Sequence, residues 1–271
     1  MTLDYLRQSV RAVVPVEDMA LISGLLQMLE GVVVSDIAND KFKLETTFVF
    51  CAVWAFGSAL TMSDDGSDNR KNFSDWWKSQ FKQVRLPTRD TVFDYWLEPA
   101  SNKFEPWRQS PSFHTVEFDS RAMKMDEVTV PTTETASISH WMGLLVRRRR
   151  PILLAGPSGL KNAECNRVPL LSAYPIFLVI VLSLGTGKTQ LIAGMLRELP
   201  LAEFISLSIN LNYYSTATVL LSSLEAPLQK RTGSTFGPPG STHLVYFIGT
   251  PLDHLPHSRI LNYTSYFAQM I

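Results

Sequence analysis

Two short glycine-rich fragments limit what this chain can fold into more than any other feature. The first directly follows the apolar run 151–155 (PILLA), and the second opens the helical run 188–199 (KTQLIAGMLREL). The fragments consist of Gly156, Pro157, Ser158 and Gly159, and of Gly185, Thr186, Gly187, Lys188 and Thr189. A buried strand that leads through glycines into a helix is the setting of a phosphate-binding loop. A phosphate-loop α/β domain is therefore expected.

Removing residues 160–185 would join the fragments into GPSGTGKT, which satisfies the pattern G-x-x-x-x-G-K-[ST]. This pattern suits ATP and Mg²⁺. Glycines let consecutive backbone N–H groups curl around a phosphate, Lys188 neutralises charge, and the Thr189 hydroxyl holds Mg²⁺. The residues of the two fragments are thus the candidate nucleotide contacts, and Thr189 is the candidate magnesium ligand in the presence of ATP.

In the chain as written, however, the loop is interrupted. Leu182 occupies the position five residues before Gly187, where the pattern requires glycine. Closing a loop as long as 160–185 costs roughly 3 kcal/mol, which a fold can absorb. The insertion nevertheless separates backbone groups that must be consecutive to form an anion site. We therefore expect ATP to bind very weakly or not at all, and deletion of 160–185 to strengthen binding.

The inserted segment also holds the strongest apolar run of the chain, 176–184 (IFLVIVLSL), and contributes to a mean hydropathy of +0.04. A membrane helix is one interpretation of this run. It needs about 20 consecutive apolar residues, and the run is about half that length. Pro169 and Pro175 interrupt any longer version. Membrane insertion is therefore not expected.

The first 85 residues are expected to be helical. Apolar residues recur at three- and four-residue spacing from Glu17 to Val32, and a nearly all-apolar helix is expected over 44–60. A third helix is expected over 71–84, with its tryptophans in a core because no basic stripe accompanies them. The polar stretch 63–69 (SDDGSDN) misplaces its glycine for an EF-hand calcium loop, so a solvated turn is expected there.

Residues 86–127 show no sustained period and are expected to be an irregular connector, with short extended pieces near 91–97 and 113–118. A helix capped by Thr132 or Thr133 follows. It ends at the run 147–150 (RRRR), where cations favour a helix C-terminus. A nuclear signal or a phosphate-binding patch is the alternative interpretation of that run.

From residue 151 strands and helices alternate. Besides the strand 151–155, strands are expected over 204–211 and 243–248, and helices over 188–199 and 215–227. This order predicts a mainly parallel sheet. The expected fold is α/β with an N-terminal helical part. A helical subdomain occupies 1–85, and an incomplete phosphate-loop α/β subdomain occupies 128–248.

Composition excludes some classes of protein. The 271 residues carry 25 basic and 25 acidic side chains, which argues against a free-standing nucleic-acid binder. Cys51 and Cys165 cannot form a disulfide scaffold, so a reducing compartment is expected. The first residues hold no continuous apolar stretch of the kind found in secretory signals.

The chain resembles dynein heavy chains, most closely the axonemal outer-arm beta type. Long and unusual stretches carry the resemblance: FVFCAVWAFGSAL (48–60), FSDWWKSQFKQVRLP (73–87), TVFDYWLEPASNKFEPW (91–107), and NLNYYSTATVLLSSLEAPLQKRTGSTFGPPG (210–240). The phosphate-loop fragments and LVYFI (244–248) also match.

This resemblance implies the end of a second AAA+ module, with 1–85 as its lid, and the start of a third module. It also implies ATP with Mg²⁺ as cofactors and a place in an ATP-driven microtubule motor of the cytoskeleton, in a ciliary or flagellar axoneme. Neighbouring ring modules would be its direct partners. Intermediate chains, light chains and microtubules would be partners only through the full-length chain. Nucleic acid is not an expected partner.

The chain departs from the family after Ile248. In the family this strand continues into two aspartates, the Walker B acids, which organise Mg²⁺ and the attacking water. Here 249–271 shows no family match, and Asp253 is its only acid. No catalytic residue is therefore assigned, and the chain is expected to be inactive alone. His254 and His257 without further ligands are a weak metal signal.

We hypothesise that 160–185 and 249–271 both derive from introns, one retained in frame and one that runs into a stop codon. The leading functional interpretation is part of a dynein motor. A non-catalytic structural AAA+ segment and an unrelated phosphate-loop ATPase remain as alternatives.

Overall fold

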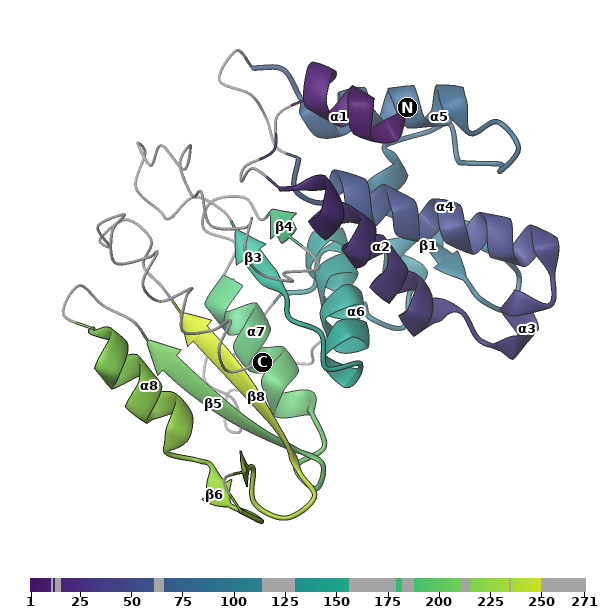
Figure 1. Ribbon diagram of the computed structural model, residues 1–271. Helices are drawn as coiled ribbons and strands as arrows, with labels where there is room; N and C mark the ends of the chain where they lie inside the picture. Colours follow the sequence, from purple (N-terminus) through teal and green to yellow (C-terminus); the bar gives the residue numbers. More distant parts are fainter. Residues whose placement is uncertain are drawn as a thin grey trace. The chain divides into compact units, whose positions relative to one another are not determined.

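The computed structural model describes most of the chain, which forms two compact units (Figure 1). The described residues are 1–10, 12, 16–60, 66–113, 130–155, 179–181, 188–210, 215–233 and 235–249. The first unit extends through strand β4, and the second begins with helix α7.

The first unit is mainly helical. Its helices are α1 (Thr2–Ser9), α2 (Asp18–Val32), α3 (Ser35–Ala38), α4 (Lys41–Gly57), α5 (Asn69–Gln80) and α6 (Thr133–Arg147). Two 3-10 turns, η1 (Val92–Asp94) and η2 (Trp107–Gln109), flank the antiparallel strands β1 (Tyr95–Glu98) and β2 (Lys103–Pro106). Strands β3 (Leu153–Ala155) and β4 (Val179–Val181) complete the unit.

Helix α4 is the centre of this unit. Asp40 caps its start by accepting hydrogen bonds from the backbone of Phe42 (2.9 Å) and Lys43 (3.3 Å). Every residue from Val49 to Ala55 is buried, as expected for a helix that is apolar on all sides. Helix α2 packs along α4 and also contacts α6.

Aromatic side chains from distant parts of the sequence fill the space beside α4. Trp54 meets Trp107 edge to face, with ring centroids 5.9 Å apart, and lies 6.1 Å from Trp141. The Trp107 indole donates a hydrogen bond to the Phe93 carbonyl at 2.9 Å. These contacts hold the β1–β2 hairpin and its two 3-10 turns against the helices. The segment 86–127 was expected to be an irregular connector with short extended pieces near 91–97 and 113–118. Strand β1 lies close to the first of these pieces, and 114–118 lies outside the described residues.

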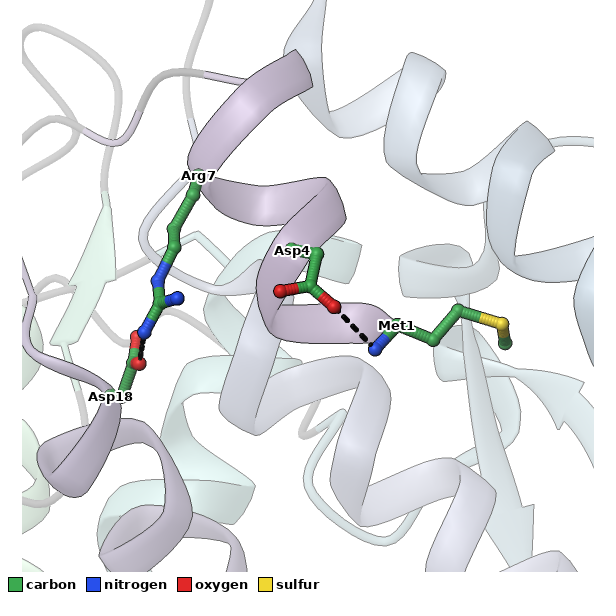
Figure 2. Close-up of polar contacts among 4 residues, drawn as sticks. All are labelled: Met1, Asp4, Arg7 and Asp18. Atoms are coloured by element: carbon green, nitrogen blue, oxygen red, sulfur yellow. Dashed lines mark hydrogen bonds and ion pairs between the residues drawn. The ribbon is translucent and has the colours of Figure 1, made fainter.

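Helix α1 lies beside α5 and is tied to α2 (Figure 2). Tyr5 stacks on Trp76 with centroids 4.2 Å apart. Arg7 forms an ion pair with Asp18 at the start of α2, and Asp4 accepts a hydrogen bond from the amino group of Met1 at 2.7 Å. These surface contacts set the direction of α1 and contribute little stability individually.

Both ends of α6 match the local chemistry of the sequence. Thr132 accepts a hydrogen bond from the Thr135 backbone at 3.1 Å, which confirms the predicted cap. At the other end Arg149 has φ 58, and Arg150 N–H donates to the Leu145 carbonyl at 2.9 Å. This six-to-one bond after a left-handed residue is a Schellman motif, in a position that usually holds glycine. The Arg150 side chain pairs with Glu30 of α2 at 3.1 Å.

The second unit contains a parallel strand pair covered by a helix. Its elements are α7 (Lys188–Glu198), β5 (Phe204–Asn210), α8 (Ala217–Glu225), β6 (Gln229–Lys230), β7 (Phe236–Gly237) and β8 (His243–Gly249). Strands β5 and β8 run in parallel, with Leu207 opposite Tyr246. The pair packs on Leu220 and Leu224 of α8, and Tyr246 donates a hydrogen bond to the Leu224 carbonyl at 2.5 Å.

A short hairpin joins α8 to β8. Strands β6 and β7 pair antiparallel, and the Arg231 guanidinium donates to the carbonyls of Pro238 (2.7 Å) and Gly240 (2.5 Å). A Cβ on Gly237 would lie 2.7 Å from Arg231 Nε. The glycine thus lets the arginine cross the strand and fasten the loop that follows.

The expected fold class is confirmed: a helical domain precedes a partial phosphate-loop α/β region. The expected helices and the strands within 151–155, 204–211 and 243–248 are present within a few residues. Part of the apolar run 176–184 is not helical but forms β4, which pairs in parallel with β3. No helix in the described part of the chain is long and apolar enough to cross a membrane.

Candidate functional site

The structure describes only the downstream edge of the predicted nucleotide site. Gly156, Pro157, Ser158, Gly159, Gly185, Thr186 and Gly187 lie outside the described residues. Strand β3 ends at Ala155, directly before Gly156 in the sequence. Lys188 is the first residue of α7, so the helix begins where the sequence pattern requires it.

Helix α7 supplies the geometry of an anion-binding end. A helix N-terminus presents unpaired N–H groups and the positive end of the helix dipole, which together favour a phosphate. Thr189 lies in the first turn with its side chain exposed, while Leu191 is buried. The Thr189 side chain is thus exposed to solvent, and its role as a ligand of Mg²⁺ stays a prediction.

The carboxyl ends of β5 and β8 are a second candidate region, because α/β sheets bind their ligands at the carboxyl ends of their strands. Gly249, the last residue of β8, lies opposite Asn210, the last residue of β5. A Cβ on Gly249 would lie 2.9 Å from Asn210 Oδ1, so the asparagine amide lies over the end of β8. Sequence reasoning did not single out Asn210, although its position at the end of a parallel strand was a signal.

Neither β5 nor β8 carries an acidic residue in its described length. The end of β5 offers an amide, not a carboxylate. Among described residues there is no group of three or more His, Cys, Asp or Glu side chains that could hold a metal ion. His254 and His257, the weak metal candidates, lie outside the described residues.

Perturbed titratable groups lie in the helical unit. His140 packs against Phe50, Trp107 and Trp141, with ring centroids 6.5, 5.5 and 5.1 Å away. Its Nε2 is buried without a hydrogen-bond partner, and burial lowers the pKa of His140 to about 4. Burial likewise raises the pKa of the Cys51 thiol. Both groups are therefore neutral and unreactive at pH 7.

Arg70 is an unusual cation of this unit. Its guanidinium lies 4.5 Å from the centre of the Phe93 ring. Burial lowers the pKa of Arg70, while the carboxylates of Glu134, Asp94 and Asp68 oppose that shift. The guanidinium remains charged at pH 7. Its position on α5, over the Phe93 ring of η1, makes it a packing element of the helical unit.

Comparison with known proteins links both units to one family. The family described as the dynein heavy chain AAA lid domain matches residues 1–109. The family described as the P-loop containing dynein motor region matches residues 168–250. This chain is built from dynein heavy chain domains. The second match includes 168–185, the later part of the segment expected to be an insertion.

Individual dynein heavy chains match across both domains. Dynein axonemal heavy chain 9 of Homo sapiens is 34% identical over 250 residues, which is 91% of this chain and 5% of the relative. The flagellar outer-arm dynein alpha chain of Chlamydomonas reinhardtii is 34% identical over 251 residues, with the same coverage. The ciliary dynein beta chain of Heliocidaris crassispina is 33% identical over 251 residues, again with that coverage.

The chain thus spans about one-twentieth of the length of these dyneins. The predicted resemblance to dynein heavy chains is confirmed, together with the lid and P-loop motor region. An alpha chain is as similar as the beta chain, so the resemblance does not by itself select the beta type.

Proposed function

We propose that this chain belongs to a dynein motor ring of a ciliary or flagellar axoneme, and that its α/β region is a nucleotide-binding module weakened by the segment 160–185. The position of Lys188, at the start of α7 and directly after Gly185, Thr186 and Gly187 in the sequence, supports the nucleotide site. The match to the P-loop dynein motor region supports ATP as the nucleotide and Mg²⁺ as its companion ion. The axonemal, flagellar and ciliary names of the relatives support the location.

In this proposal the lid is the last part of the second AAA+ module of a beta-type heavy chain, and the P-loop region is the first part of the third module. The direct partners are neighbouring modules of the same ring. Contacts with intermediate chains, light chains and microtubules belong to the full-length motor and not to this segment.

The chain alone is not proposed to hydrolyse ATP. Water attack on a phosphate needs groups that organise Mg²⁺ and the nucleophile. The described end of β8 offers Gly249 beside Asn210 and no carboxylate. This observation favours nucleotide sensing, or a purely structural role, over catalysis. An unrelated phosphate-loop ATPase is not favoured, because the lid and the motor region both match dynein.

Binding of a fluorescent ATP analogue with Mg²⁺ tests the proposal. The full chain is expected to bind very weakly. A variant that lacks 160–185 contains the uninterrupted GPSGTGKT and is expected to bind more tightly by at least about tenfold, or about 1.4 kcal/mol. Lys188→Ala in the deletion variant is the matched control and is expected to abolish that gain. Micromolar or tighter binding by the full chain would refute the weakening. A folded deletion variant without binding would refute the nucleotide site.

A single substitution offers a second route to the same site. Ala155 of β3 and Val181 of β4 are register partners, and each ends its strand. Six residues separate Val181 from Lys188, about the spacing that Ala155 acquires when 160–185 is deleted. Strand β4 can therefore serve as the strand before the phosphate loop, with Leu182 as the one departure from the sequence pattern.

Leu182→Gly creates the complete pattern GSLGTGKT after β4 without shortening the chain. We expect it to raise affinity for the ATP analogue, and Leu182→Ala not to do so, since alanine resists the backbone conformations that glycine allows. If only the deletion variant gains affinity, β3 is the required leading strand.

A further inference from the structure

Four consecutive arginines, Arg147 to Arg150, stand where α6 ends in the first unit. Arg147, Arg148 and Arg149 are exposed, and Arg150 is partly exposed. The guanidinium group of Arg150 pairs with Glu30 of α2 at 3.1 Å. The run, called here the α6 arginine patch, concentrates positive charge in a chain whose 25 basic and 25 acidic side chains otherwise balance.

The backbone of the patch is held in one conformation by hydrogen bonds to the end of α6. The N–H groups of Arg148 and Arg150 donate to the Leu145 carbonyl at 3.0 and 2.9 Å, and the Arg149 N–H donates to the Val146 carbonyl at 2.9 Å. The last carbonyls of a helix need such partners, and the Schellman motif supplies them from the backbone. The arginine side chains are therefore not required to satisfy these carbonyls.

Helix stability does not account for the whole run of arginines. A cation is favoured by the helix dipole at a C-terminus, but this effect falls off within the last turn. Four neighbouring cations also repel one another. Arg149 moreover has φ 58, a left-handed conformation that glycine adopts without strain. Because strained and self-repelling groups are typical of binding sites, these two costs favour a site for an anionic group.

The arrangement of the patch fits an extended anion better than a compact one. Successive residues of an α-helix lie about 100° apart around its axis. Arg147 and Arg148 therefore start from different sides of the helix end, and the left-handed Arg149 turns the chain away from the helix path. Arginine binds a carboxylate through two parallel N–H···O bonds. An extended segment with several Asp or Glu side chains can meet these arginines one after another.

We propose that the α6 arginine patch binds an acidic segment of another protein, with Arg147 and Arg148 as the main contacts. The fixed backbone lowers the entropy cost of binding, because only the arginine side chains become ordered. Nucleic acid is a polyanion as well, but its binding proteins usually carry a basic surplus that this chain lacks. Since the contacts are exposed charges, salt weakens the binding.

Binding of a fluorescein-labelled oligoglutamate peptide to the full chain tests the proposal. Fluorescence anisotropy is measured at low and at physiological ionic strength, and the affinity should be higher at low ionic strength. The double variant Arg147→Gln, Arg148→Gln should raise the dissociation constant about tenfold or more, because it removes both main contacts.

The double variant Lys82→Gln, Arg85→Gln is the matched control. Lys82 and Arg85 are exposed, belong to the same unit, and lie outside the patch in sequence. This variant changes the net charge by the same amount, so it should bind the peptide within about twofold of the wild-type chain. Circular dichroism verifies that both double variants are folded.

Three outcomes would overturn the proposal. The wild-type chain could fail to bind oligoglutamate even at low ionic strength. The control variant could lose as much affinity as the patch variant, which would assign the binding to the total charge and not to the patch. Single-stranded DNA with the same number of charges could bind more tightly than the peptide and depend on Arg147 and Arg148, which would make the patch a nucleic-acid surface.

Discussion

At the scale of single residues, burial in the helical unit keeps the His140 side chain in its neutral form. His140 belongs to an aromatic cluster with Phe50, Trp107 and Trp141, and its Nε2 is buried without a partner. A charged imidazole there would lose its hydration without gaining a counter-ion. The cluster therefore tolerates only the neutral ring, which couples the stability of the unit to pH.

Acid is expected to destabilise this unit through His140. The folded pKa is about 4 and the ordinary value 6.5, so between these pH values the unfolded chain binds a proton that the folded chain excludes. The free energy of unfolding therefore keeps its full value above pH 6.5 and decreases as pH falls towards 4, by up to about 3 kcal/mol. Urea unfolding at pH 7.5, 6 and 4.5 measures the effect. His140→Phe should reduce this pH dependence, and an unchanged pH dependence would contradict the assignment.

Arg149→Gly is expected to stabilise the first unit by about 1 kcal/mol. Arg149 has φ 58 at the Schellman end of α6, a conformation that costs a residue with a Cβ about that much and glycine nothing. Thermal unfolding provides the measurement. Arg148→Gly is the matched control: its φ is −89, so glycine there only adds flexibility to the unfolded chain and should destabilise slightly. Equal shifts in both variants would disprove the strain argument.

At the scale of elements, close packing between helices and turns determines which residue a helix position can hold, and the sequence pattern alone does not show this. Gly57, the last residue of α4, faces two buried rings. A Cβ there would lie 2.4 Å from Phe93 Cζ and 2.9 Å from Phe73 Cε1. The missing side chain lets η1 and α5 approach α4. The glycine is thus a packing requirement of the unit, although it stands in a helix where alanine would ordinarily be preferred.

Gly57→Ala is expected to destabilise the chain by about 1–3 kcal/mol, because overpacking of the two rings outweighs the gain in helix propensity. Gly143→Ala in α6 is the matched control. Nothing lies within 4 Å of its Cβ position, so this variant should gain about 0.5–1 kcal/mol. Both free energies can be measured by chemical denaturation. Stabilisation by Gly57→Ala would show that the rings move aside at little cost.

At the scale of the whole molecule, the segment 160–185 is the main question. It lies between the two fragments of the predicted phosphate loop, yet the match to the P-loop motor region includes its later part, and β4 within it pairs with β3. If 160–185 comes from a retained intron, the mature transcript lacks its codons. If it is a genuine part of the protein, the mature transcript contains them.

Sequencing of the mature transcript separates these origins. Under the intron hypothesis, spliced reads should lack the codons for 160–185. Reads that contain the codons for 160–185 throughout would contradict the hypothesis, and β4 would then be a genuine strand of the protein.

Local patterns were enough to predict most helices and strands. The apolar period of α2, the Thr132 cap of α6 and the alternation of β5 act over a few residues, and the structure retains each of them. The start of α7 at Lys188 followed in the same way from the phosphate-loop pattern. The dynein resemblance also came from the sequence, because long unusual stretches are specific in a way that one short motif is not.

Features that depend on distant contacts could not be predicted from the sequence. The hairpin β1–β2 has little period of its own and is held by Trp107 and Phe93 against α4. Asn210 becomes part of the candidate site only because β5 and β8 pair in one register. The sequence by itself determined the elements, the neutral composition and the dynein ancestry of this chain. Only the tertiary structure decided how strands pair and which glycines and polar groups are buried, because those outcomes rest on contacts between residues far apart in the chain.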